Sequence, residues 1–201
     1  ERSEKSQIWV MSVTGGEPWQ FTYEKQGVGT FSWSPNGSKI AFLMKDDKTE
    51  DEEKNEKEKK DVILVDQNFK YSHIYIKNFT TEVDTNKSER FTEGNYDING
   101  FDWHPQDTKI VFSHRPEPTY NSGFGSGNIS LLELATKEVK SIVNREGVDG
   151  GPSFSPNGKL IAFISNGGQR EEIGLSDIFV VDSQGGKPRK LAETPNRHSR
   201  G

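Results

Sequence analysis

Cysteine is absent from the sequence, which excludes disulfide bonds, thiol catalysis and thiolate metal sites. A cytoplasmic and a periplasmic or exported location both remain open. The sequence also lacks an apolar run approaching the ~20 residues that span a bilayer, and residues 1–6 lack the apolar core of a signal peptide. The abrupt start and the polar tail at 193–201 suggest a piece of a longer chain, so the missing signal says nothing about the parent.

The sequence also has no excess of positive charge and few hydrophobic residues. Lys and Arg number 26 against 31 Asp and Glu, which gives a formal net charge of −5. A nucleic-acid binder needs a basic surface to displace counterions from phosphate, so nucleic acid is not an expected partner. Hydrophobic residues make up only 30% of the chain, but 12 Phe, 5 Tyr and 4 Trp are present. Aromatic side chains suit thin sheets packed face to face better than one thick core.

Three segments share one pattern, which predicts β-hairpins. In residues 31–42, 101–112 and 152–163, an aromatic residue lies two positions before a proline, and an apolar triplet starts five positions after it. Proline ends the first strand and fixes φ, and the following Asn-Gly supplies the turn into the second strand. The middle copy has Gln106-Asp107 in place of Asn-Gly.

A second pattern predicts a third and a fourth strand after each hairpin. The third strands alternate with period 2 and lie at 7–10, 73–76, 128–131 and 177–180. Short fourth strands follow at 19–22, 89–92, 139–142 and 189–191. The turns that begin at Gly15-Gly16 and Gly185-Gly186 start at the same offset from their third strands, which supports a true repeat.

Four strands per unit at this spacing predict an all-β fold, a partial β-propeller of about three and a half blades. The predicted units are a half-blade at 7–22, blades at 27–92, 96–143 and 148–192, and a tail at 193–201. A closed ring needs at least four blades, so the chain is an open arc unless other chain completes it. A two-sheet sandwich is the structural alternative, but it does not explain the fixed five-residue offset. The half-blade is expected to leave a bare edge at residues 8–10, which predicts self-association or marginal stability.

Long insertions separate the second and third strands of each unit. Residues 46–61 carry 14 charges, which predicts a solvated, largely disordered loop; the alternative is a short exposed helix supported by Glu53–Lys57 and Glu56–Lys60 pairs. The ladder of a calcium loop is absent there. The apolar run at 62–65 is a candidate extra strand. The other two insertions lie at 115–127 and 166–175, and alternation of strand direction places all three on one face.

Catalytic, metal and cofactor sites are not predicted. A Gly-x-Ser-x-Gly elbow is missing, and residues 123–127 fit neither a dinucleotide fingerprint nor a P-loop. The four histidines lack metal-ligand spacing: His104 takes a turn position of the repeat, His73 precedes a third strand, His114 follows a second strand, and His198 is in the tail.

Two acidic and three aromatic positions are candidates for a ligand-binding role as well as for a structural one. Asp97 and Asp149 precede inner strands and could point into a central channel, but capping or turn hydrogen bonds are the favoured role. Trp33, Trp103 and Phe154 are expected to pack between blades and not to form a ligand cage.

Residues 33–42 and 154–163 resemble the WD40-like PD40 repeat of TolB-type propellers. The same repeat builds the N-terminal propeller of prolyl oligopeptidase-family serine peptidases, including acylaminoacyl peptidase-like and dipeptidyl peptidase IV-like enzymes. The resemblance spans residues 7–192, and the middle repeat departs from it at His104 and at the Gln-Asp turn. The insertion that runs through residues 60–75 looks like the elaborated strand link of acylaminoacyl peptidase-like propellers, which favours the peptidases.

This resemblance implies a non-catalytic propeller segment of a serine peptidase. The segment would contact a C-terminal α/β-hydrolase domain, absent here, and would limit which peptides reach its active site. The alternative is a TolB-like, non-enzymatic propeller that binds a protein partner. A third hypothesis, an independent propeller lyase or glycosidase, requires paired carboxylates at the channel, and the sequence shows only scattered ones.

Overall fold

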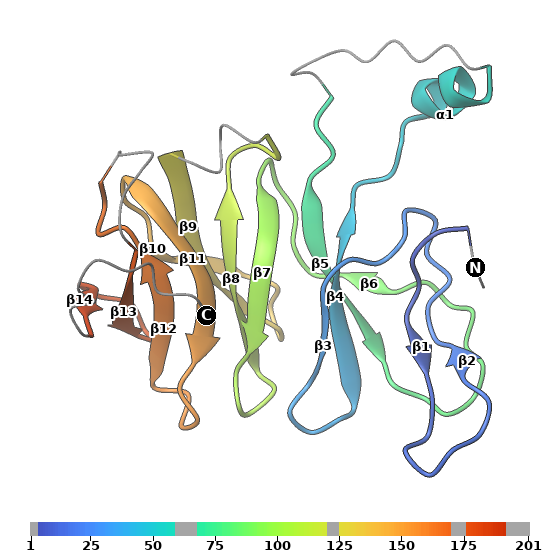
Figure 1. The fold of residues 1–201 in the computed structure, drawn as a ribbon, viewed down its shortest axis with the longest axis horizontal. Coiled ribbons are helices and arrows are strands. Elements are labelled where there is room, and N and C mark those ends of the chain that lie inside the picture. The colour runs from blue at the N-terminus through green and yellow to red at the C-terminus, as the bar shows by residue number, and fades with distance from the viewer. Residues whose placement is uncertain (1–3, 59–67, 120–124, 170–175, 192–201) are drawn as a thin grey trace.

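The computed structural model describes residues 4–58, 68–119, 125–169 and 176–191, which are coloured in Figure 1. Apart from one short helix, the regular structure in these residues consists of β-sheets that stand beside one another like blades, and all strand pairs but one are antiparallel (Figure 1). The fold is a partial β-propeller, as the repeat predicts. Among the described residues, no helix has the length and apolar character needed to cross a membrane.

The N-terminal half of the arc contains a two-stranded and a four-stranded sheet. The two-stranded sheet pairs β1 with β2, and the four-stranded sheet follows sequence order from β3 to β6. Their bounds are β1 (Trp9–Val10), β2 (Trp19–Gln20), β3 (Phe31–Trp33), β4 (Lys39–Lys45), β5 (Ser72–Asn78) and β6 (Glu89–Arg90). His73, expected to precede a third strand, lies inside β5, which begins at Ser72.

The C-terminal half contains two further sets of four strands. Their bounds are β7 (Asp97–Trp103), β8 (Lys109–Arg115), β9 (Ser126–Glu133), β10 (Val139–Val143), β11 (Gly147–Phe154), β12 (Leu160–Ser165), β13 (Asp177–Asp182) and β14 (Arg189–Lys190). His114, Asp97 and Asp149 thus lie within strands and not beside them.

A short parallel ladder joins these two sets into one eight-stranded sheet, which the repeat pattern did not predict. Gly147 and Val148 of β11 pair with Ser126 and Gly127 of β9. A Cβ on Gly127 would lie 2.7 Å from the carbonyl oxygen of Asp149, so only glycine permits this approach.

The repeated proline hairpin is fixed by side-chain bonds to its own turn. The Lys39 N–H donates to Ser34 Oγ (3.0 Å), and the Ser38 N–H donates to Asn36 Oδ1 (2.8 Å). Gly37 has a φ of 71°, in the left-handed region that favours glycine. Ser155 and Asn157 accept the corresponding bonds in the last hairpin.

His104 is a turn residue, as its place in the repeat predicts. The Gln106 N–H donates to His104 Nδ1 (3.1 Å), a bond two residues along the chain, whereas the serines of the other copies accept an N–H five residues along. Asp107 has a φ of 58°, in the same left-handed region as Gly37 of the first copy, whose φ is 71°. The ring also packs edge-on against Phe154 of the next sheet, with centroids 4.9 Å apart. The middle repeat therefore keeps the hairpin geometry with different residues.

Apolar cores fill the spaces between successive sheets. The second strand of each four-stranded unit supplies a fully buried phenylalanine, Phe42, Phe112 or Phe163. Each faces the sheet that precedes it: Phe42 packs with Ile8 and Phe21, and Phe112 packs with residues of β4 and β5. Burying such a side chain contributes about 1.5–3 kcal/mol, so these cores hold the sheets together.

The first insertion contains a helix, so the expectation of a disordered loop is wrong for the residues described there. Helix α1 (Glu50–Lys57) begins with a capping box: the Glu52 N–H donates to Thr49 Oγ1, and the Thr49 N–H donates to Glu52 Oε2 at 2.7 Å. Glu53, expected to pair with Lys57, instead pairs with Lys25 of the body at 3.1 Å.

Several sequence expectations fall outside the described residues. These are the candidate strand at 62–65, the Glu56–Lys60 pair, part of the other two insertions, His198 and the tail at 193–201. The described ends of the insertions do lie on one face, which is at the top of Figure 1 together with α1.

Candidate functional site

A cluster of charged residues forms where β4 and β6 end and β5 begins. Asp46 follows β4, and its carboxylate binds Arg90 Nη1 at 3.0 Å. The second carboxylate oxygen accepts the Tyr71 N–H at 3.1 Å, which ties the return of the insertion to the sheet. Arg90 also donates from Nε to the Thr92 carbonyl (2.8 Å). The charges of Asp46 and Arg90 therefore hold these strand ends together.

His73 lies beneath this pair and is completely buried. Its Nδ1 is 3.2 Å from Thr92 Oγ1, while Nε2 has no hydrogen-bond partner and lies 3.9 Å from Asp46. Burial, assisted by the positive charge of Arg90, lowers the pKa of His73 to about 4. The imidazole is therefore neutral at pH 7, and it is not charged for an ion pair with Asp46.

Tyr96 and His114 continue this cluster between the sheets. The Tyr96 ring packs edge-on against His73 (5.5 Å) and tilted against His114 (4.9 Å). Burial raises the pKa of Tyr96 and lowers the pKa of His114. His114 Nε2 lies 2.9 Å from Ser130 Oγ, an arrangement that could suggest a nucleophile and its base. Ser130 is buried, however, and among the described residues no carboxylate binds His114, so this contact links β8 to β9.

The two acidic residues at the inner strands form buried ion pairs. Asp97 accepts two bonds from Arg115, at 3.0 and 3.1 Å, and the Ser72 N–H of the preceding sheet at 3.0 Å. Asp149 accepts two bonds from Arg145, both at 3.0 Å. The carboxylates are buried, so neither points into an open channel. The sequence analysis did not predict the arginine partners: Arg115 is 18 residues from Asp97, and Arg145, although only four residues from Asp149, lies outside any helix.

The three repeat aromatics occupy equivalent positions but differ in burial. Trp103 and Phe154 are buried in the cores, and Trp103 Nε1 donates to the Ser32 carbonyl of the preceding sheet (3.3 Å). Trp33 is 42% exposed and packs edge-on against Phe79. The expected packing role thus holds for two of them. Trp33 is exposed because the sheet before it has only β1 and β2.

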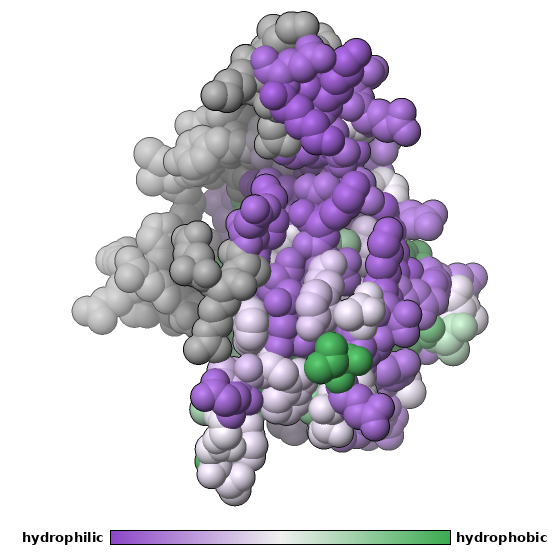
Figure 2. Space-filling view, turned by 90° about the vertical axis from the view of Figure 1, so that its right-hand side faces the viewer, coloured by the Kyte–Doolittle hydropathy of each residue, from purple (hydrophilic) through white to green (hydrophobic). Residues whose placement is uncertain are grey.

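The N-terminal end of the arc was expected to present an apolar face. Figure 2 shows this end as largely hydrophilic or neutral, with a strongly hydrophobic group near the centre of the view and further hydrophobic atoms at its right margin. Ile8, placed on the expected bare edge, is buried against Phe42 and Met44. Self-association through this end stays a prediction.

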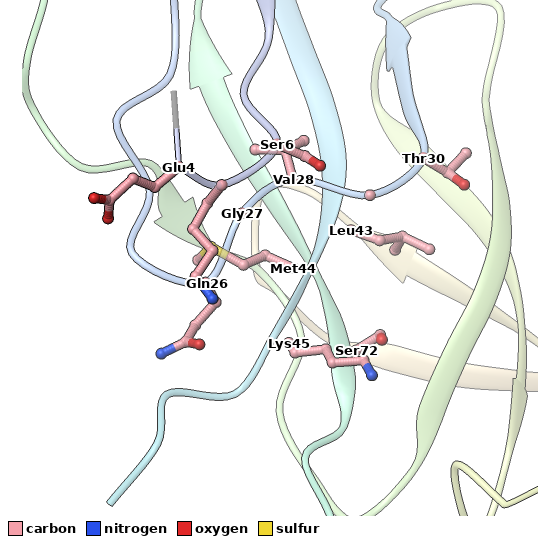
Figure 3. Close-up of a pocket in the computed structure, with 12 residues that line it drawn as sticks. Glu4, Ser6, Gln26, Gly27, Val28, Thr30, Leu43, Met44, Lys45 and Ser72 are labelled. Carbon is pink, nitrogen blue, oxygen red and sulfur yellow. The ribbon is translucent and has the colours of Figure 1, made fainter. Parts of the chain in front are cut away.

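A pocket of about 490 Å³ opens beside β1 on the insertion face (Figure 3). Residues 4–6, residues 26–30, the end of β4 and Ser72 line it. Met44 extends toward Gly27, and Lys45 lies beside Ser72 (Figure 3). Glu4, Lys5 and Lys45 bring opposite charges to the lining, which contains no histidine and no acid other than Glu4. The pocket can hold a small polar group and offers no assembled catalytic set.

The charged and polar groups of the described residues therefore form a network that joins strand ends and neighbouring units. The described residues contain no group of three or more His, Asp or Glu that could hold a metal ion. Arginines neutralise the buried Asp97 and Asp149, and burial favours the neutral form of His73 and His114. This arrangement can position loops for binding.

Sequence comparison finds local similarity to known proteins. No family model matches the chain. Over 58 residues it is 36% identical to the Tol-Pal system protein TolB of Francisella tularensis subsp. mediasiatica, which covers 29% of this chain and 13% of that protein. The chain thus spans a small part of the curated relatives that it matches.

Solved structures match over nearly the whole chain at low identity. A TolB-type protein from Agrobacterium tumefaciens superposes with a TM-score of 0.65 at 16% identity, covering 96% of this chain and 57% of that one. Oligogalacturonate lyase from Vibrio parahaemolyticus gives 0.62 at 13% identity, over 94% and 46% of the two chains. Prolyl oligopeptidase B from Galerina marginata gives 0.54 at 12% identity, over 88% and 25%. The chain therefore has the TolB-like β-propeller fold, which enzymes and other proteins share.

Proposed function

We propose that this chain is a non-catalytic β-propeller segment that binds polypeptide through its insertion face. We define that face by the connections β4–β5, β8–β9 and β12–β13. The observation that carries the proposal is that these three long connections leave the sheets at one end, where α1 also lies (Figure 1). Insertions gathered on one side of a repeat protein commonly form its binding surface. The repeat units proposed are 7–22, 27–92, 96–143 and 148–192.

The geometry of α1 supports a contact role. Its capping box and two ion pairs, Lys25–Glu53 (3.1 Å) and Lys70–Glu52 (2.7 Å), hold it against the body of the propeller. Its remaining surface is charged and exposed, as Asp51 and Lys54 illustrate. A charged, pre-positioned helix selects partners by electrostatic complementarity.

One form of this proposal is the propeller of a serine peptidase. The insertion face would then contact an α/β-hydrolase domain of the same polypeptide and limit the peptides that enter. The similarity to prolyl oligopeptidase B supports this form. A TolB-like propeller that binds a separate protein is the second form, supported by the local sequence similarity to TolB. A hydrolase domain with Gly-x-Ser-x-Gly followed by Asp and His, encoded after residue 201, would favour the first form.

Photo-crosslinking in the full polypeptide tests the binding face. A crosslinking residue at Lys54 or Asn55 reports on the insertion face, and one at Asn36 or Asn157 reports on the opposite, hairpin face; all four positions are exposed. We expect polypeptide outside residues 1–201 to crosslink to the first pair only. Equal crosslinking from both faces, or crosslinking from the hairpin face alone, would refute the proposal.

Activity assays test the non-catalytic part independently. The purified 201-residue chain is expected to hydrolyse neither peptide nor ester substrates, because no nucleophile, base and orienting group come together in the described residues. Hydrolysis that survives purification and disappears in a Ser130→Ala variant would contradict this expectation.

A further inference from the structure

The second and third units enclose a groove at their outer edge, where the fourth strand of one unit meets the next unit. The groove has a volume of about 430 Å³, and its lining combines aromatic, aliphatic and charged side chains: Arg90, Phe91, Glu93, Tyr96, Lys137 and Val139. Four-stranded units border it on both sides. The equivalent groove between the first and second units differs from it in one chemical group.

One wall of each groove is the link that follows the fourth strand. Two threonines define equivalent positions there, because each hydroxyl accepts the N–H of its unit's third-strand isoleucine, at 2.8 and 2.9 Å. Glu24 follows Thr22 by two residues in the first link, and Gly94 follows Thr92 by two residues in the second. A Cβ on Gly94 would lie 2.8 Å from Tyr96 Cε1, so no carboxylate side chain fits there.

The opposite wall of each groove is the start of the next fourth strand, where Ser88 and Val139 are equivalent. The strand registers place each of them opposite the residue three positions after the buried isoleucine of its third strand. In the first groove, the Ser88 N–H and Oγ donate to Glu24 Oε1 at 3.1 and 2.7 Å. Lys77 Nζ lies 5.4 Å from the Phe21 ring centre beside them. The first groove is therefore filled by a bound carboxylate, and Glu24 is only 8% exposed.

Val139 lines the second groove, and its N–H has no counterpart of that carboxylate to bind. The Glu133 N–H donates to the Glu138 carbonyl at 2.9 Å, so the adjacent pair, which contains Val139, directs its main-chain groups away from the ladder. Pro18 and Pro188 occupy the same position in the other two units, which agrees with an N–H that strand pairing does not use. The Val139 N–H is thus available to a ligand.

The lining also contains two donors with unused capacity, Lys137 and Tyr96. Lys137 Nζ binds Glu89 Oε1 at 2.7 Å and the Arg90 carbonyl at 3.1 Å, which leaves one of its three protons. The Tyr96 hydroxyl is buried without a hydrogen-bond partner among the described residues. Burial raises the pKa of Tyr96, so the hydroxyl keeps its proton at neutral pH. Glu93, the acid of the lining, is exposed to solvent.

We propose that this groove binds a carboxylate on a short aliphatic stem, supplied by a glutamate side chain or by the free C-terminus of a polypeptide. The carboxylate takes the place that Glu24 holds in the first groove and accepts bonds from the Val139 N–H and Lys137 Nζ. The second groove already has the same contact of lysine with an aromatic ring, since Lys137 lies 4.8 Å from the Phe91 ring centre. The stem packs against Phe91 and the exposed Val139 side chain.

An NMR titration of the full polypeptide, with nitrogen-labelled valine and phenylalanine, tests the proposal. The probes are acetylglutamate amide, which offers a side-chain carboxylate, acetylglycine, which offers a terminal one, and acetylglutamine amide, which is the neutral isostere of the first. The Val139 amide signal, identified by its loss in Val139→Pro, should respond to a carboxylate with at least about tenfold higher affinity than to the isostere. The carboxylate that binds more tightly identifies the source.

Three variants separate this groove from general electrostatic attraction. Lys137→Gln and Val139→Pro should each weaken binding of the tighter carboxylate by about tenfold, as measured from the Phe91 amide signal. Lys140→Gln is the matched control, because it removes an exposed lysine of the same strand whose ammonium binds the Gln184 carbonyl. This control should leave the affinity unchanged.

Equal responses to the carboxylates and the isostere, or no response to any probe, would overturn the proposal. An affinity that survives Val139→Pro, while circular dichroism shows the variant folded, would overturn it as well. So would an equal loss in Lys140→Gln, because binding would then depend on net charge and not on this groove. Lys137→Gln provides the same test if Val139→Pro does not fold, since it leaves the main chain unchanged.

Discussion

The cores between the sheets and the insertion that contains α1 are held in place by different forces. The cores bury phenylalanines and isoleucines completely, whereas α1 is polar throughout and touches the body through ion pairs such as Lys25–Glu53. Exposed ion pairs contribute about 0–1 kcal/mol each, and a buried phenylalanine contributes about 1.5–3 kcal/mol. Packing between the sheets therefore provides most of the folding stability, and the insertion can take part in binding without being needed for that stability.

The largest predicted effect is the loss of a core phenylalanine. Phe112→Ala should lower the free energy of unfolding by about 3–5 kcal/mol, because it removes apolar contacts and leaves a cavity between the second and third units. Urea unfolding followed by circular dichroism measures this change. Val13→Ala, at an exposed turn, should change stability by less than about 0.5 kcal/mol. Similar midpoints for the two variants would contradict the assignment of stability to the cores.

The next effect concerns the buried ion pair in the last unit. Asp149→Asn should cost about 3 kcal/mol, because it leaves the Arg145 charge without its carboxylate in a buried setting. The double variant Asp149→Leu with Arg145→Met should recover most of that loss, since it removes both charges. Chemical denaturation of the two variants tests this, and a double variant no more stable than the single one would argue against it.

A third effect links stability to pH through His73. Its pKa is about 4 in the folded chain and 6.5 when unperturbed, so the unfolded chain binds the proton first. Stability should therefore be unaffected by this group above pH 6.5 and fall as pH drops toward 4, by up to about 3 kcal/mol. The charged neighbours Asp46, Arg90, Glu93 and Asp97 surround it.

His73→Gln is the matched variant for this pH effect. Gln7 holds the equivalent position in the half-blade, where its Oε1 accepts a bond from Thr22 Oγ1 (2.8 Å). The variant should keep the contact to Thr92 and lose part of the acid sensitivity between pH 6.5 and 4. Melting midpoints across this range compare the two proteins, and identical pH profiles would show that another group is responsible.

The smallest effect is expected in the insertion. Deleting residues 48–58 removes α1 and its surface pairs, and it should lower stability by no more than about 1 kcal/mol, or a few degrees in the melting midpoint. The same deletion should reduce crosslinking or binding at the insertion face. A collapse of folding would show that the segment packs as the cores do and would remove the contrast between the two regions.

The sequence predicted the fold well because local signals repeat in it. The offset from Pro35, Pro105 and Pro156 to the following apolar strand sets each hairpin, and period-2 alternation sets the third strands. The short helix was only the alternative expectation for this insertion, because its composition resembles that of a disordered segment. Its capping box, Thr49 with Glu52, was a usable signal.

The polar contacts were less accessible from sequence because they join distant residues. The pairing of Asp97 with Arg115 and of Asp46 with Arg90 depends on where strand ends meet, and no spacing rule relates them. Burial of His73 depends on its contacts with Thr92 and Tyr96, which no local pattern specifies.

By itself the sequence determined the all-β repeat, its hairpins and the role of His104 as a turn residue, because each depends on neighbours within a few positions. Only the tertiary structure decided which charges pair, which histidines are buried and that Ile178, unlike Ile74, remains exposed. These properties depend on which sheet packs against which, and packing between units is not encoded within any one of them.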